Sequence, residues 1–235
     1  MKSFTSIKRR RASVLARRMS ETSPIDERLI ARLAEIGRMQ PTVDLTKRDT
    51  YVAAAGWNVD AREIGLPSEE PGPASAHGSF SIACEILAQY RFPPPRLIRG
   101  RFDPAAPLDG RAMLLTASFL WIRFELPVRV SRVIDEARTG TDGVEQLWGY
   151  SYQTLAGHLE RGEITFEIIK TIATGAVRFR IHSFSQTGHI AGLLYRVGFR
   201  LVGRRMQGRF ARESLRNMQR LVAGSLMASQ GRPSP

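Results

Sequence analysis

The chain has 235 residues, of which 43% are hydrophobic and 24% charged, close to the usage of ordinary soluble domains. These values fit one domain with additional segments at its two ends, and they exclude a collagen, a fully disordered chain and a disulfide scaffold. Cys84 is the only cysteine, so it has no internal disulfide partner, and no Cys/His cluster has the spacing of a zinc site. We therefore expect no metal and no cofactor.

The formal net charge of +13 is concentrated at the two ends of the chain. Residues 1–20 sum to +7 and residues 187–235 to +8, whereas residues 21–186 sum to −2. Basic ends attract phosphate on anionic membranes or nucleic acids without a specific site. Arg outnumbers Lys by 31 to 4, a bias typical of a GC-rich genome, and we expect a bacterial source.

The first segment, residues 1–22, is expected to be a basic flexible tail. The charge of Lys8–Arg11 resembles the start of an export signal, but no apolar segment of roughly ten residues follows, so secretion is not expected. An organelle transit peptide is the alternative if the source is eukaryotic. No apolar run approaches the ~20 residues of a membrane-spanning helix. We predict a cytoplasmic protein, with peripheral membrane attachment as an alternative.

A first amphipathic helix is predicted for residues 24–38. Ser23 can cap its N-terminus, Pro24 suits the first helical position, and Asp26 lies where a capping box has an acid. Apolar residues three and four positions apart then share one face of this helix. Residues 66–79 are rich in Pro, Gly, Ser and Ala, a composition typical of a loop.

A second helical stripe begins at Phe80 and ends before the three prolines that start at Pro93. Cys84 lies beside this stripe and is expected to be buried and inert, because no basic partner is near it in sequence. We divide the chain into a basic tail (1–22), a helix and loop extension (23–79), a single domain (80–228) and a disordered tail (229–235).

The apolar period changes from helical to two after Pro95, which predicts strands. No helical pattern separates these strands, so their succession favours an antiparallel meander. Thr174 and Gly175 predict a hairpin turn between the last two. The strands are expected near residues 97–102, 112–119, 120–134, 145–153, 163–170 and 176–184.

A long C-terminal helix is predicted over about residues 189–228. Its two apolar stripes are out of phase, with Gly203 and Gly208 between them, which favours a kinked or two-part helix. Arginines at helical spacing form either a solvated face or a surface for anionic membranes. Nucleic acid is not expected as a partner, because few aromatic side chains accompany these arginines. The arginines are Arg196, Arg200, Arg204, Arg209, Arg212, Arg216 and Arg220.

The segment from Tyr150 to Glu163 carries a recognisable pattern, Tyr-Ser-Tyr-Gln-Thr-Leu-Ala-Gly-His-Leu-Glu-Arg-Gly-Glu. It resembles the signature of an uncharacterised family called domain of unknown function 1990. Gln153 and Leu159 depart from that signature, where many members have Gly and Pro. The resemblance implies no agreed activity. It covers roughly residues 80–225 and includes Ala88–Pro93, Arg129–Glu136 and Phe179–Ser185 and the positions Arg205, Gln207 and Phe210.

The predicted turn from Gly157 to Glu163 brings His158, Glu160 and Glu163 together. A His with two carboxylates indicates an acid–base centre or a weak metal site. Alternatively, His158 bonds a backbone carbonyl and Glu160 is solvated beside Arg161. No nucleophile elbow, phosphate-binding loop or metal-ligand spacing accompanies the three residues. Whether the protein is an enzyme stays open, and the sequence leans towards a non-catalytic role.

Three aromatic residues, Trp148, Tyr150 and Tyr152, share one face of a predicted strand. They either line a cavity, in which the phenol hydroxyls orient a ligand, or form ordinary core. The candidate ligand-binding residues are Trp148, Tyr150, Tyr152, His158 and Phe166.

The predicted fold is α+β: short N-terminal helices, then a curved antiparallel sheet of about six strands packed on the long C-terminal helix. This order resembles the helix-grip fold of START and Bet v 1-like proteins, whose cavity between sheet and helix takes an apolar or amphipathic ligand. The first hypothesis is a non-catalytic small-molecule or lipid-binding domain. The alternatives are a protein attached peripherally to anionic membranes by its Arg-rich helix, and a hydrolase-like enzyme centred on His158 with Glu160 or Glu163.

Overall fold

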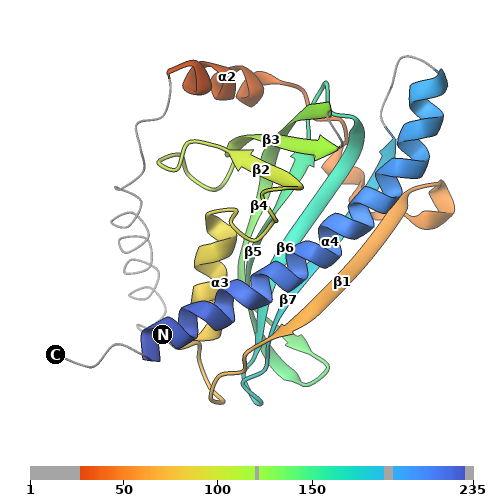
Figure 1. Ribbon diagram of the computed structural model, residues 1–235. Helices are drawn as coiled ribbons and strands as arrows, with labels where there is room; N and C mark the ends of the chain where they lie inside the picture. The colour runs from red at the N-terminus through yellow and green to blue at the C-terminus, as the bar shows by residue number, and fades with distance from the viewer. Residues whose placement is uncertain (1–26, 120–121, 188–192, 231–235) are drawn as a thin grey trace.

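The computed structural model describes residues 27–119, 122–187 and 193–230, and only the backbone course over 193–206. Within these ranges, one antiparallel sheet has the strand order β1-β7-β6-β5-β4-β3-β2 (Figure 1). Every neighbouring pair of strands is antiparallel, as the absence of intervening helices predicts. The strands are β1 (Asn58–Leu66), β2 (Ile98–Arg101), β3 (Ala112–Phe119), β4 (Ile122–Gly140), β5 (Gly143–Thr154), β6 (Glu160–Thr171) and β7 (Val177–Thr187).

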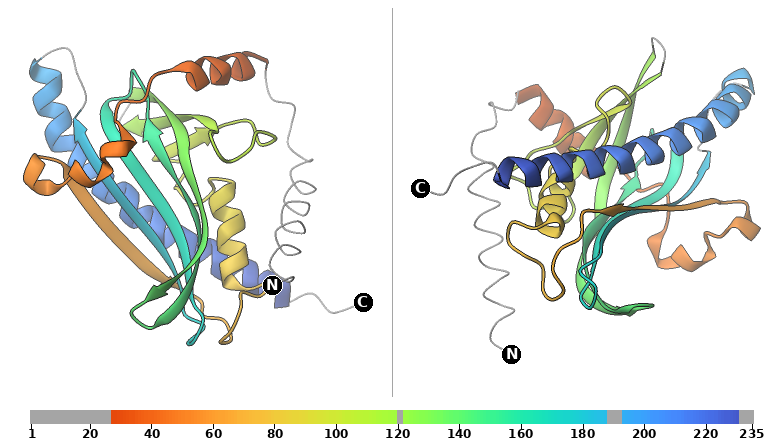
Figure 2. Two further views of the ribbon diagram at one scale, coloured as in Figure 1. Left: turned by 180° about the vertical axis from the view of Figure 1, so that it is seen from behind. Right: turned by 60° about the horizontal axis from the view of Figure 1, so that its bottom comes forward.

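The helices cover the two faces of this sheet. The long helix α4 crosses the concave face with α3 beside it, whereas the two 3₁₀ helices η2 and η3 lie on the convex side (Figure 2). The predicted α+β class with a helix-grip-like arrangement is therefore confirmed. The helices are α2 (Glu27–Arg38), η2 (Leu45–Thr50), η3 (Ala53–Ala55), α3 (Ser79–Ala88) and α4 (Leu193–Gln230).

The C-terminal helix differs from the sequence prediction in one respect. We expected a kinked or two-part helix; α4 is one helix from Leu193 to Gln230, which rules out the two-part alternative but not the kinked one. Figure 1 shows its course bending towards the N-terminal, light blue end. The helix therefore stays continuous where its apolar stripe moves from one side to another. Long helices commonly curve around the core that they cover.

The strand β1 corrects the prediction for residues 23–79, where we expected only a helix and loops. Asn58–Leu66 pairs along its whole length with β7 and adds a seventh strand to the described sheet. Only Leu66 is buried in this edge strand, and Val59 is 54% exposed. Because most of its side chains face solvent, β1 lacks the apolar alternation that identifies a half-buried strand.

The main core fills the space between the concave face and the helices α3 and α4. Side chains separated by two positions, such as Tyr150 with Tyr152 and Phe166 with Ile168, project together into this space. The rings of Phe92 and Phe166 lie 4.8 Å apart between their centroids. The alternation that predicted these strands thus also identifies the residues that form the core.

Candidate functional site

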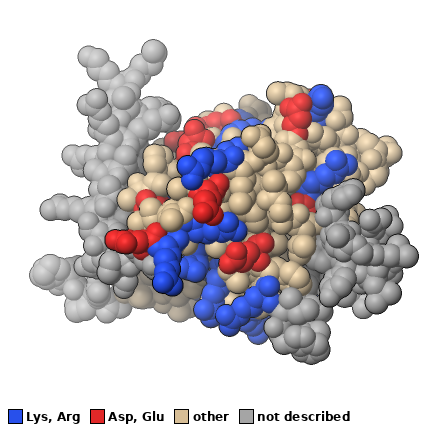
Figure 3. Space-filling view, turned by 90° about the horizontal axis from the view of Figure 1, so that it is seen from above, with Lys and Arg blue, Asp and Glu red and all other residues tan. Residues whose placement is uncertain are grey.

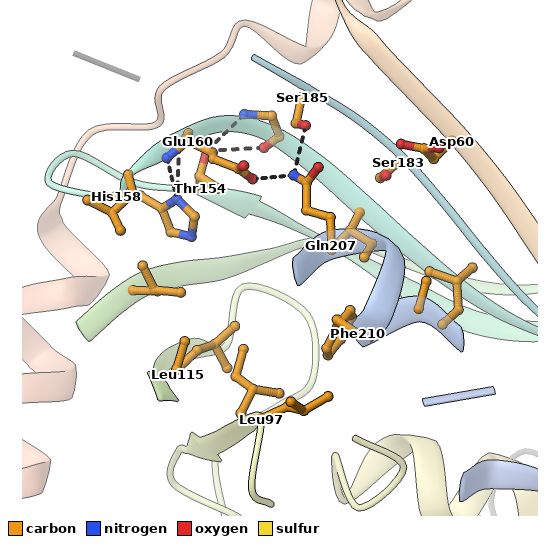
Figure 4. A pocket seen from close by; sticks show the side chains of 18 of the residues that line it. Asp60, Leu97, Leu115, Thr154, His158, Glu160, Ser183, Ser185, Gln207 and Phe210 are labelled. Atoms are coloured by element: carbon orange, nitrogen blue, oxygen red, sulfur yellow. Dashed lines mark hydrogen bonds between the residues drawn. The ribbon is translucent and has the colours of Figure 1, made fainter. Parts of the chain in front are cut away.

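A cavity of about 490 Å³ lies on the concave side of the sheet, where the described side chains of α4 begin. Its surface includes side chains from β1, β3, β4, β5, β6, β7 and α4, together with the segment that leads into β2. Figure 4 shows that the apolar side chains Leu97, Leu115 and Phe210 lie across from a polar group. We call this polar group the polar end of the cavity; it consists of Thr154, His158, Glu160, Ser185 and Gln207.

The turn between β5 and β6 places His158 at the polar end. Gly157 has φ +87°, a left-handed conformation that glycine adopts without the strain a Cβ would add. The amide of His158 donates to the carbonyl of Leu155 at 3.0 Å, which closes the turn. Gly157 therefore suits the backbone conformation of the turn that was predicted at this point of the chain.

The imidazole of His158 is held by the backbone of a single residue. Its Nδ1 lies 3.0 Å from the amide nitrogen and 2.9 Å from the carbonyl oxygen of Glu160. The amide can donate to an unprotonated Nδ1, and a protonated Nδ1 can donate to the carbonyl, so both neutral tautomers have a backbone partner. Burial lowers the pKa of His158 to about 4, which keeps the ring neutral at physiological pH.

The carboxylate of Glu160 projects from the first residue of β6 into the cavity (Figure 4). Nε2 of Gln207, on α4, donates to its Oε2 at 2.6 Å and lies 3.2 Å from Oγ of Ser185. Burial raises the pKa of Glu160 to about 6, and the hydrogen bond from Gln207 opposes this shift. The polar end thus combines a neutral imidazole with a carboxyl group that titrates near neutral pH.

The structure separates Glu163 from His158 and Glu160, although we expected the three to lie together. Arg48 of η2 donates to both carboxylate oxygens of Glu163, with Nε 2.9 Å from Oε2 and Nη2 2.7 Å from Oε1. Ser131 donates to Oε1 at 2.6 Å. These partners lie on the convex side, because residues an odd number of positions apart on a strand face opposite ways.

Of the five candidate ligand-binding residues, the structure places Tyr152 and His158 at the cavity. Tyr150 and Phe166 are buried in the main core, and the Tyr150 hydroxyl donates to the carbonyl of Leu87 at 3.3 Å. Trp148 packs against the same core. Of the three aromatic residues of this strand face, Tyr152 borders the cavity, and it also belongs to the main core.

Sequence reasoning missed Ser183, Ser185 and Gln207 as residues of the site. The two serines continue the alternation of Phe179 and Ile181, so they were predictable as polar positions on an inward face. Gln207 was noted only as part of a family-like pattern. No local signal identifies its contact with Glu160, which lies 47 residues earlier in the chain.

The arginines of the C-terminal helix divide into two groups. Arg209, Arg212, Arg216 and Arg220 are exposed, whereas the side chains of the other three candidates, Arg196, Arg200 and Arg204, lie outside those that the structure describes. Arg209 donates to Glu213 at 2.7 Å. In the space-filling view from above, basic and acidic side chains are interspersed over the surface (Figure 3).

Two further findings concern metals and membranes. Within the described residues, no group of three His, Cys, Asp or Glu side chains could hold a metal ion. None of the helices in the described part of the chain is both long and apolar enough to span a bilayer.

The sequence model of a family described as "Domain of unknown function (DUF1990)" matches residues 40–217. No curated protein sequence matches the chain.

The similar solved structures include Ara h 8.0201, which is 12% identical with a TM-score of 0.42, over 72% of this chain and 99% of that one. TTHA0849 from Thermus thermophilus is 9% identical with a TM-score of 0.44, and the match covers 72% of this chain and 99% of that one. A norcoclaurine synthase from Thalictrum, in complex with a transition-state analogue, is 12% identical with a TM-score of 0.44, and the match covers 72% of this chain and 95% of that one. The matched range of the family model contains every residue of the polar end.

Proposed function

The chain belongs to the DUF1990 family, whose function is unknown, and we propose that it is a binding domain for an amphipathic small molecule. The ligand occupies the cavity between the concave face of the sheet and α4. The observation that carries this proposal is the composition of the cavity wall, in which apolar side chains such as Leu97, Leu115 and Phe210 face the polar end, while the other charged side chains of the wall belong to exposed residues. Ligand sites are commonly apolar cavities of roughly 300–1,000 Å³ with a few convergent polar groups, and this cavity has both properties.

The two parts of the wall have separate roles in this proposal. Leu97, Leu115 and Phe210 bury the apolar body of the ligand, which releases water from both surfaces and provides most of the affinity. Glu160 and His158 hydrogen-bond its polar group and so select its orientation. A ligand without a polar group covers these two groups without giving them a further hydrogen bond, which costs affinity.

Filling the cavity with a protein side chain tests the proposal. Ser183 lines the cavity, whereas the preceding residue, His182, projects from the opposite face of β7. Ser183→Trp occupies cavity space, and His182→Trp adds the same side chain on the other side of the sheet. We expect Ser183→Trp to lose uptake of the apolar fluorophore N-phenyl-1-naphthylamine and His182→Trp to keep it.

The measurement is a fluorescence titration of the full chain, accompanied by native mass spectrometry of the purified protein to detect a co-purified ligand. Circular dichroism melts of both variants confirm that the compared proteins are folded. Equal uptake by Ser183→Trp and the wild type would place the fluorophore outside the cavity and contradict the proposal. A wild-type protein that takes up no fluorophore and carries no ligand contradicts it too.

A further inference from the structure

The buried carboxylates of the described structure share one property. Glu145, Glu163 and Glu167, the buried carboxylates among the described residues, each lie within 4.0 Å of a Lys or Arg nitrogen, as does Glu69, whose side chain is 6% exposed; this pairing offsets the cost of removing the charge from water. The pairs are Glu69 with Lys170, Glu145 with Arg138 and Arg178, Glu163 with Arg48, and Glu167 with Arg138 and Arg180.

Glu160, which is partly buried, departs from this pattern. No side chain that the structure describes places a Lys or Arg nitrogen within 4.0 Å of its carboxylate, and its one side-chain hydrogen bond comes from the neutral amide of Gln207. A neutral donor offsets less of the desolvation cost of a carboxylate than a cation does. The carboxylate lies between Gln207 of α4 and the cavity (Figure 4). The described surroundings of Glu160 therefore lack the cation that those four carboxylates have.

The remaining charged groups at the cavity do not replace that cation. Asp60 and Arg62 project from the edge strand β1, and Arg96 and Arg209 share the carboxylate of Glu213. All four of these cavity side chains belong to exposed residues, so water and salt screen their fields. Tyr152 on β5 and His158 are neutral at physiological pH, because burial raises the pKa of the phenol to about 12 and lowers that of the imidazole to about 4.

We propose that the ligand of this cavity is a cationic amphiphile, whose protonated amine pairs with Glu160 while its apolar body lies against Leu97, Leu115 and Phe210. The inference deepens the proposed function and rests on it. An ammonium group has three N–H donors, and the polar end has acceptors for them. These are the Glu160 carboxylate, Nε2 of His158 in the tautomer whose Nδ1 donates to the Glu160 carbonyl, and Oγ of Ser185.

Three probes of equal chain length test this inference: decylamine, decanol and decanoate. Isothermal titration calorimetry of the full chain at pH 7.5 measures the affinity for each. We expect decylamine to bind at least about tenfold more tightly than decanol, the factor that one charge-assisted hydrogen bond supplies, and decanoate to bind most weakly. Glu160→Gln should abolish the preference for the amine. The matched control is Glu136→Gln, which removes an exposed carboxylate that does not line the cavity and should leave the preference unchanged.

The outcomes separate the inference from the proposed function. If none of the three probes binds to the folded wild type, the proposed function fails. If decanol or decanoate binds as tightly as decylamine, or if Glu160→Gln keeps the preference, the cavity binds amphiphiles but the cationic ligand is wrong. If Glu160→Gln does not fold, titrations of the wild type with decylamine at pH values from 7.5 to 5 replace it. Decylamine affinity should then fall as the pH drops below about 6, and an affinity constant across that range overturns the inference.

Discussion

Glu160 and Glu163 lie three residues apart on β6 and project from opposite faces of the sheet. On the convex face, Glu163 is 2% exposed and accepts hydrogen bonds from Arg48 and Ser131. On the concave face, Glu160 borders a cavity, and among the described side chains Gln207 alone donates a hydrogen bond to its carboxylate. The convex carboxylate is satisfied by the protein itself, whereas the concave one has capacity left for another molecule.

The same contrast extends along the sheet. The convex side carries further paired groups, in which Glu145 contacts Arg138 and Arg178 and Glu167 lies near Arg180. Ionic groups that are paired in this way link neighbouring strands on the convex face and leave no unpaired charge for another molecule. Unpaired polar groups at a cavity, by contrast, are typical of a binding site. The convex face of these strands therefore carries paired charges, whereas the concave face holds both the main core and the cavity.

The largest loss of stability is expected from a substitution of Lys170. It measures how much a buried ion pair on the concave face contributes to the free energy of unfolding. Lys170 is 1% exposed, and its Nζ lies 2.6 Å from Oε2 of Glu69, which is 6% exposed. Lys170→Met leaves that carboxylate buried without a cation, and we expect a loss of about 4 kcal/mol in the free energy of unfolding. Urea denaturation measures it. The double variant Glu69→Gln/Lys170→Met should recover part of the loss, and full additivity would show that the pair is not coupled.

The second prediction concerns the acid sensitivity that His158 gives to the cavity. Its pKa falls from an ordinary 6.5 to about 4 on folding. Between these values the unfolded chain binds a proton that the folded chain does not, so stability is lost as the pH falls, by up to about 3 kcal/mol. His158→Gln removes this loss. Denaturation of both proteins from pH 7 to 4 should show the wild type declining relative to the variant, and parallel curves would contradict a buried neutral ring.

The third prediction compares one substitution on the two faces. Glu163→Gln breaks the charge-assisted hydrogen bonds from Arg48 and should cost about 2 kcal/mol at pH 7. Glu160→Gln removes a carboxylate that no described Lys or Arg side chain pairs with, so stability should be unchanged or higher. The pKa of Glu160 rises from 4.5 to about 6 on folding, so the wild type gains stability as the pH falls from 6 to 4.5. Thermal melts at pH 7 and 4.5 test both variants, and equal losses at pH 7 would remove the contrast.

The smallest effect is expected at the turn that positions the polar end. Gly157 has φ +87° and open space where a Cβ would lie, so Gly157→Ala introduces backbone strain without a steric clash. We expect a loss of about 1 kcal/mol. Gly65→Ala is the matched control, since Gly65 also has open space but lacks a left-handed φ. The two melting temperatures decide whether strain at the turn is real; an equal change in both would contradict it.

Much of the architecture follows from local patterns. Alternating apolar residues place the strands that pack against the core, because each residue pair on a strand must put one side chain on each face. The same rule separates Glu160 from Glu163, although we grouped them by their closeness in sequence. The edge strand β1 was not predicted, because Leu66 is its one buried residue and solvent-facing strands carry little apolar signal.

The sequence by itself determined the antiparallel sheet, the long final helix, the turn at Gly157 and the inward face that holds Tyr152. The tertiary structure alone decided which charged groups are paired. Arg48 meets Glu163 across 115 residues and Lys170 meets Glu69 across 101, whereas Gln207 reaches Glu160 across 47 and brings no charge. Strand alternation is a local property of the backbone, but pairing depends on distant segments that meet only when the sheet closes around its helix.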